Sequence, residues 1–167
     1  MKNKKITLNV VAAALFAALT CVATMIIVIP SPLKGYMNLG DCIVLLAGWS
    51  LSPLYGFFAA GLGSALADLL SGYVVYAPAT FLIKGLMAVI VYYGFKLLCK
   101  KVGNLPSRII FGIVAEIFMI LGYLIFEGFL YGFGIAALNI PANGVQGAAG
   151  IIIGCVLSKM FEKLKLN

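Results

Sequence analysis

The chain has 167 residues, of which 63% are hydrophobic and only 10% are charged. Soluble domains average roughly 45–50% apolar and 25% charged residues, so a water-soluble fold of this size cannot hide so much apolar surface. The composition therefore excludes a soluble enzyme, a nucleic-acid-binding module and a disordered chain. The net charge of +7 arises from cations between the apolar runs, which is typical of an integral membrane protein.

The apolar runs predict an all-α protein with six transmembrane helices in one domain, residues 1–167. The first run is longer than the apolar core of a signal peptide, about 7–15 residues, and is predicted to remain as a membrane span. The second and third runs are short and are separated only by Ser52 and Pro53, which predicts a tight hairpin. The six segments are residues 6–29, 39–51, 54–70, 79–98, 109–131 and 142–161.

The positive charges predict the orientation of these helices. A cytoplasmic N-terminus places ten cations on the inner side and Lys34 alone on the outer side, while Lys84 lies within a span. Both termini are then cytoplasmic, in a multi-pass protein of the cell membrane. The ten inner cations are Lys2, Lys4, Lys5, Lys96, Lys100, Lys101, Arg108, Lys159, Lys163 and Lys165.

With this topology, polar residues of five helices lie at one depth, in the outer third of the bilayer. A charged group in hydrocarbon costs at least about 2.5–3.5 kcal/mol and normally faces a bundle interior or a watery cavity. We therefore expect an outward-facing pocket, with only Glu116 lying nearer the cytoplasm. The polar residues at this depth are Asn38, Asp41, Asp68, Lys84, Glu127, Asn143 and Gln146.

Several of these residues have a structural alternative. Asp41 lies in a first helical turn, where the helix dipole favours a carboxylate, and Asp68 could pair with Lys84. Asn143 and Gln146 are three residues apart, so they share a helix face and are expected to contact ligand.

The fifth segment carries an aromatic and acidic stripe, which suits a planar, polar ligand. Its members are Glu116, Tyr123, Glu127 and Tyr131. The loops add Tyr36, Met37, Tyr73 and Tyr76, which either form a lid over the pocket or anchor the loops at the membrane interface.

Two pairs of small residues mark one end of the first helix, Ala13 with Ala17 and Ala14 with Ala18. Such pairs let helices approach closely in lipid, either within the bundle or with an external helix. The chain has no histidine, no CxxC pair and no phosphate-binding GxxxxGK[ST] loop. We therefore expect no catalytic residue, no metal site and no cofactor.

Three stretches, residues 35–41 (GYMNLGD), 64–72 (SALADLLSG) and 77–85 (APATFLIKG), resemble the substrate-binding S components of energy-coupling factor (ECF) vitamin transporters. The resemblance implies a six-helix bundle that works with a transmembrane T component and two ATPase subunits. It implicates Ala13, Ala14, Ala17 and Ala18 in coupling to the T component. Together with the residue analysis it predicts substrate contacts by Tyr36, Asn38, Lys84, Tyr123, Glu127, Asn143 and Gln146.

The resemblance is closest to members that handle small heteroaromatic compounds such as pyridoxine or hydroxymethylpyrimidine. Three acids with one lysine suit a polar or partly cationic ring. The alternative function is a stand-alone, homo-oligomeric, proton-coupled small transporter in which Glu116 or Glu127 carries the proton. A membrane enzyme is a third candidate, which the missing histidine and the missing GxSxG motif disfavour.

Overall fold

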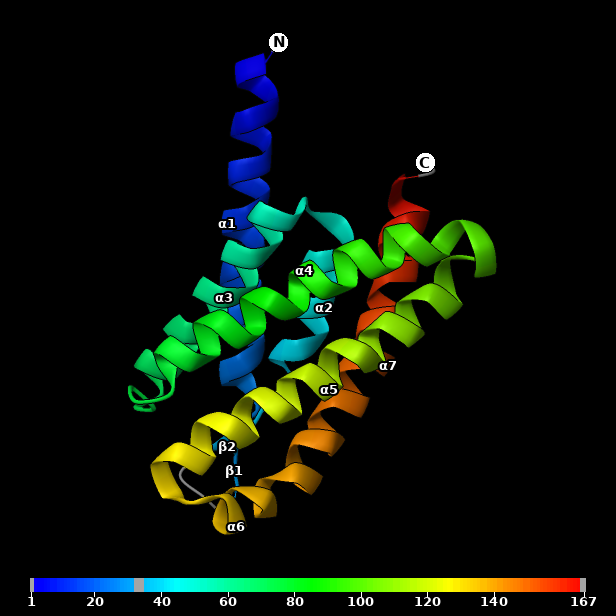
Figure 1. The fold of residues 1–167 in the computed structure, drawn as a ribbon. Helices are drawn as coiled ribbons and strands as arrows, with labels where there is room; N and C mark the ends of the chain where they lie inside the picture. The colour runs from blue at the N-terminus through cyan, green and yellow to red at the C-terminus, as the bar shows by residue number, and fades with distance from the viewer. Residues whose placement is uncertain (1, 32–34, 166–167) are drawn as a thin grey trace.

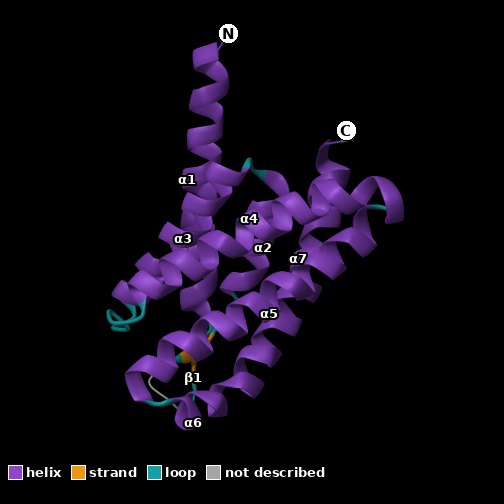
Figure 2. Ribbon diagram, viewed as in Figure 1, coloured by secondary structure: helices purple, strands orange, loops and turns teal. Residues whose placement is uncertain are grey.

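The computed structural model describes residues 2–31 and 35–165. Six long or medium helices form a bundle, with a two-stranded hairpin and a short helical turn at one end (Figures 1 and 2). The elements are α1 (Lys2–Ile26), β1 (Ile29–Pro30), β2 (Tyr36–Met37), α2 (Gly40–Ser50), α3 (Pro53–Leu70), α4 (Ala77–Val102), α5 (Asn104–Tyr131), α6 (Phe133–Ala136), η1 (Ala137–Asn139) and α7 (Ile140–Lys165).

Five of these helices, α1, α3, α4, α5 and α7, are long and apolar enough to cross a bilayer. Large apolar side chains are exposed along all five, as expected where lipid replaces water. The bundle is therefore the fold of a multi-pass membrane protein, as the composition predicts.

Helix α2 differs from the predicted span. It has 11 residues, which at 1.5 Å per residue reach only about 16 Å, roughly half of a bilayer core. Every residue from Gly40 to Gly48 is buried, because α2 packs against α1, α3, α4 and α7. The short second segment is an inner helix, and its uninterrupted apolar sequence reflects burial on all sides.

The main core joins α2 to the tilted helices α4 and α5. Val44 and Leu45 of α2 pack against Met87 and Val91 of α4 and against Met119 of α5, and all five are fully buried. This core holds α2, α4 and α5 at fixed positions, and these helices carry three of the seven polar residues predicted at one depth: Asp41, Lys84 and Glu127.

Both chain ends lie at the same end of the bundle (Figure 1). The opposite end holds the β1–β2 hairpin, in which Ile29 pairs with Met37 and Pro30 with Tyr36, together with α6. Neither the hairpin nor α6 was predicted. The predicted first span reached residue 29, but α1 ends at Ile26 because the chain turns there into the hairpin. Lys34, the predicted outer cation, lies outside the described residues.

Glycine allows a close helix contact between α1 and α3. A Cβ atom added at Gly63 would lie 2.4 Å from the carbonyl oxygen of Ala17 and 2.8 Å from Cβ of Thr20. We expect Gly63→Ala to lower the free energy of unfolding in detergent by about 1–3 kcal/mol, because backbone atoms on α1 must move. Gly144→Ala is the matched control: no atom lies within 4 Å, so a helical alanine there should be neutral or stabilise by up to about 1 kcal/mol. Equal stability of the two variants would contradict this packing.

Candidate functional site

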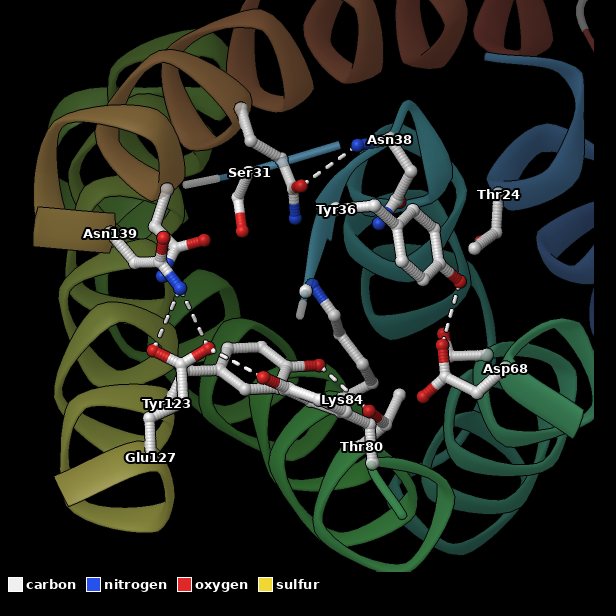
Figure 3. A pocket seen from close by; sticks show the side chains of 15 residues that line it. Thr24, Ser31, Tyr36, Asn38, Asp68, Thr80, Lys84, Tyr123, Glu127 and Asn139 are labelled. Carbon is white, nitrogen blue, oxygen red and sulfur yellow. Dashed lines mark hydrogen bonds between the residues drawn. The ribbon is translucent and has the colours of Figure 1, made fainter. Parts of the chain in front are cut away.

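A hollow, shown from close by in Figure 3, lies beside the β1–β2 hairpin, at the end of the bundle opposite to the chain termini (Figure 1). The space between its side chains is about 460 Å³ when the open mouth is included, and side chains that cross it leave little of this space free. Side chains from the end of α1, the hairpin, α3, α4, α5, η1 and the start of α7 meet across it. All seven residues predicted to contact substrate line this one hollow: Tyr36, Asn38, Lys84, Tyr123, Glu127, Asn143 and Gln146.

A buried ion pair lies at the base of the hollow. The ammonium of Lys84 donates to Oδ1 of Asp41, and the two residues are only 2% and 0% exposed. Gln146 donates from Nε2 to Oδ2 of Asp41 at 2.6 Å, and its Oε1 accepts from the backbone N–H of Asn38 at 2.9 Å. A buried charge is tolerated when it is paired and hydrogen-bonded, and this chain of contacts meets that condition.

These contacts bear on the structural alternatives for two acids. Asp41 lies in the first turn of α2, as expected, and its carboxylate there binds Lys84 and Gln146. The suggested pairing of Asp68 with Lys84 is wrong, because Lys84 pairs with Asp41. Asp68 accepts a hydrogen bond from the hydroxyl of Tyr36 at 2.6 Å, because the hairpin carries Tyr36 over the end of α3.

The opposite wall of the hollow is built around Glu127 of α5. Its carboxyl group accepts two hydrogen bonds from Nδ2 of Asn139, at 2.8 and 3.0 Å, and one from the hydroxyl of Tyr76 at 3.2 Å. One turn earlier on α5, the hydroxyl of Tyr123 is 3.0 Å from Oγ1 of Thr80, and the Tyr123 ring lies 5.6 Å from the Lys84 ammonium. This wall offers an aromatic face beside carboxyl oxygens.

Aromatic side chains also cover the hollow. The rings of Tyr36 and Tyr73 are 4.4 Å apart between centroids, and Tyr73 lies edge-on to Tyr76 at 6.4 Å. Burial, and next the charge of Asp68, raises the pKa of Tyr36 above its usual range. Burial, and next the charge of Glu127, does the same to the pKa of Tyr76. Both phenols therefore stay protonated and act as hydrogen-bond donors to the two acids.

Several residues that line the hollow were not predicted from the sequence: Thr24, Ser31, Gly35, Ser64, Thr80 and Asn139. Most carry small uncharged polar side chains, which apolar runs contain for many reasons, so their type alone gives no signal. Asn139 belongs to the unpredicted turn formed by α6 and η1. Ser64 could have been found by its spacing, because it lies one helical turn before Asp68 on the same face of α3.

The rest of the stripe on α5 lies outside the hollow. Tyr131 is not among the lining residues. Glu116 is 4% exposed and lies against α7, where a Cβ added at Gly147 would be 2.9 Å from its Oε2. Within the described residues, neither carboxyl oxygen of Glu116 has a hydrogen-bond partner. Gly147 and Gly150 leave the space that this buried acid occupies.

The two alanine pairs on α1 face in different directions. Ala13 packs against the buried cluster that includes Phe16 and Leu46, and the backbone of Ala17 approaches Gly63 of α3. Ala14 and Ala18 are exposed. Ala13 and Ala17 are half-buried and contact the rest of the bundle, whereas Ala14 and Ala18 are the more exposed members of the two pairs.

The fold and the lined hollow at one end of it define the class of this protein, a multi-pass membrane protein with a polar and aromatic hollow. Residues 4–163 match the family model described as "ECF-type riboflavin transporter, S component". The chain belongs to this family of ECF transporter S components, which bind a vitamin, work with a T component and ATPases, and are not enzymes.

Individual proteins are similar to this chain over most of its length. A Pyrococcus woesei protein, "Uncharacterized protein in gap 3'region", is 40% identical over 143 residues, which is 85% of this chain and 93% of the relative. A solved structure described as "Structure and mechanism of the S component of a bacterial ECF transporter" superposes with a TM-score of 0.78 over 100% of both chains, at 25% identity. An S component for biotin has a TM-score of 0.70 over 100% of this chain and 95% of that chain, at 18% identity, and shows the fold alone.

Proposed function

We propose that this S component captures a heteroaromatic vitamin from the outer side of the membrane and delivers it inward with a T component and two ATPases. The observation that carries the proposal is the convergence of seven predicted polar and aromatic residues on one hollow. Tyr123 offers a ring face, while Asp68 and Glu127 offer hydrogen-bond acceptors on opposite walls. A planar ring with polar edges satisfies both features.

Two kinds of ring are candidates. The acids, the lysine and the narrow space between crossing side chains favour a small ring such as pyridoxine or hydroxymethylpyrimidine. The name of the matched family suggests riboflavin, whose ring is larger. S components share a fold while their pockets differ, so the fold does not choose between these compounds.

Calorimetric titration of the purified protein with pyridoxine, hydroxymethylpyrimidine and riboflavin tests the proposal. We expect saturable one-to-one binding of at least one of the three compounds. Biotin is the matched control compound, because it is a vitamin without an aromatic ring. Binding of biotin and of none of the three heteroaromatic compounds would contradict the proposal.

Asn143 offers a sharper test within the hollow. Its half-buried side chain lines the wall and makes no hydrogen bond to other described residues, so its amide is available to a ligand. We expect Asn143→Ala to weaken vitamin binding by at least about 1 kcal/mol, or about fivefold, with little change in stability. The control is Asn104→Ala, at the start of α5 and far from the hollow, which should leave the dissociation constant of the vitamin unchanged. Unchanged affinity of Asn143→Ala would remove this residue from the site.

The proposed orientation has both termini in the cytoplasm. The predicted inner cations Lys4, Lys5, Lys100 and Lys101 lie at or near ends of helices on the side of the termini, as the positive-inside rule favours. The hollow then opens outward, and the β1–β2 hairpin with Tyr36 is its lid.

The proposed docking surface for the T component is the exposed face of α1. The side chains of Ala14 and Ala18 are small, so a partner helix can approach the backbone of α1 closely on this face. The neighbouring exposed side chains on α1, including Leu15 and Leu19, are apolar and suit contact within the bilayer.

A further inference from the structure

One corner of the hollow holds three buried oxygen atoms without partners. They are Oγ1 of Thr24 at the end of α1, Oγ of Ser64 on α3, and Oδ2 of Asp68 one turn later on α3. The three residues are 3%, 2% and 3% exposed. Within the described residues, none of these atoms makes a hydrogen bond, although all three residues line the hollow.

The corner is held in place by tight packing. Thr24 lies against the start of α2, since a Cβ added at Gly40 would collide with its hydroxyl, and α1 and α3 approach closely at Gly63. Tyr36 fixes Asp68 through its other carboxyl oxygen. Figure 3 shows Thr24 and Asp68 on the same side of Tyr36, across the hollow from Glu127 and Asn139.

Buried polar atoms without a hydrogen-bond partner lower the stability of a protein unless a ligand or water binds them. A buried polar group without a partner costs about 1–3 kcal/mol, so three in one corner indicate that a ligand group completes them. A carboxylate oxygen can only accept a hydrogen bond, whereas the two hydroxyl groups can accept or donate. The corner therefore needs hydrogen-bond donors, at least at Asp68.

The charges around the hollow restrict the ligand further. Lys84 is the cation that lines the hollow in the described residues, and Asp41 already engages it. A carboxylate or phosphate group would bring no donor to Asp68 and would add a negative charge between Asp68 and Glu127. Like charges at short range in a site of low dielectric are unfavourable.

We infer that the corner formed by Thr24, Ser64 and Asp68 is a subsite for an uncharged or cationic arm of the substrate that donates hydrogen bonds, such as a hydroxyl or amino arm. It accepts the free vitamin and rejects a form whose arm is phosphorylated or carboxylated. The inference rests on the proposed function, because Tyr123 and Glu127 must hold the ring for the arm to reach α1 and α3.

The experiment compares matched compounds on the purified full chain. One set is riboflavin, lumichrome (the ring without the hydroxylated arm) and flavin mononucleotide (the arm phosphorylated). The other set is pyridoxine, its deoxy analogue and its phosphate ester. Dissociation constants are measured by calorimetry for wild type, for Thr24→Val and Ser64→Ala, and for the control Ser158→Ala. Ser158 is buried on α7, donates to the carbonyl oxygen of Cys155 at 2.8 Å and does not line the hollow.

In the set that binds, we expect wild type to favour the hydroxylated compound over both analogues by at least about tenfold, equivalent to about 1.4 kcal/mol. Thr24→Val and Ser64→Ala should weaken only the hydroxylated compound, by about threefold to tenfold, and Ser158→Ala should weaken none. The comparison on wild type needs no substitution, so a variant that fails to fold leaves the test intact.

Four results would overturn the inference. If the ring without its arm binds wild type as tightly as the hydroxylated compound, the subsite is wrong while the proposed ring site stands. The same holds if the phosphate ester binds equally well, or if both variants weaken the bare ring as much as the full compound. If no compound of either set binds wild type, the proposed function fails and this inference fails with it.

Discussion

Replacing Lys84 with alanine is expected to weaken vitamin binding at least about tenfold and to lower the free energy of unfolding by about 3–5 kcal/mol. The ammonium is buried against Asp41, which is itself fully buried. Removing one partner leaves an uncompensated acid inside a membrane bundle, with Glu116 nearby as a second buried acid. Denaturant unfolding in detergent gives the stability, and calorimetry gives the affinity.

Two further variants separate stability from binding. Lys96→Ala, on the same helix but exposed, should change the stability by no more than about 0.5 kcal/mol. The double variant Lys84→Met with Asp41→Asn removes both charges and should recover most of the stability without recovering binding. Wild-type stability of Lys84→Ala would show that the ion pair does not hold the base of the hollow.

Replacing Ala14 or Ala18 with tryptophan is expected to abolish ATP-driven uptake while vitamin binding stays within about twofold of wild type. An indole on this exposed face keeps a partner helix from approaching the backbone of α1. The hollow lies at the far end of α1 and is reached only by Thr24, so the substitution leaves its lining intact. Uptake by proteoliposomes that contain the T component and both ATPases provides the measurement.

The control for this prediction is Ile117→Trp, which places the same side chain at an exposed apolar position of α5. It should transport normally. Tryptophan at Ala13 or Ala17 would be a poorer test, because those residues pack inside the bundle and the variants would lose stability. Normal uptake by Ala14→Trp and Ala18→Trp would rule out this face as the docking surface.

The sequence predicted the hollow because membrane depth is a strong constraint. Once the helices were ordered by charge, Lys84, Glu127 and Gln146 fell at one level, and a polar group in lipid has few places to go other than a shared interior. The same reasoning found α5 and α7 as walls. Depth in the membrane does not say which way a side chain points around its helix axis. It therefore predicted which residues line the hollow better than it predicted their hydrogen-bond and ion-pair partners.

The ion pair of Lys84 shows what depth could not predict from the sequence, the choice between two possible acidic partners. Asp41 and Asp68 lie at the same depth, and Lys84 can be paired with either on that ground alone. The structure selects Asp41 because α2 is a short inner helix packed against α4, while the hairpin delivers Tyr36 to Asp68. Both the hairpin and α6 are too short to leave a periodic pattern in the sequence, so their contacts with the site could not be predicted.

Reconstitution of the purified chain alone, compared with the chain plus a T component and two ATPases, tests most directly whether it is a capture subunit. Labelled vitamin should bind to vesicles that contain the chain alone without accumulating inside them. Uptake should begin only when the partners and ATP are supplied. Accumulation driven by a proton gradient in vesicles that contain this chain alone would contradict the account and would favour a stand-alone transporter.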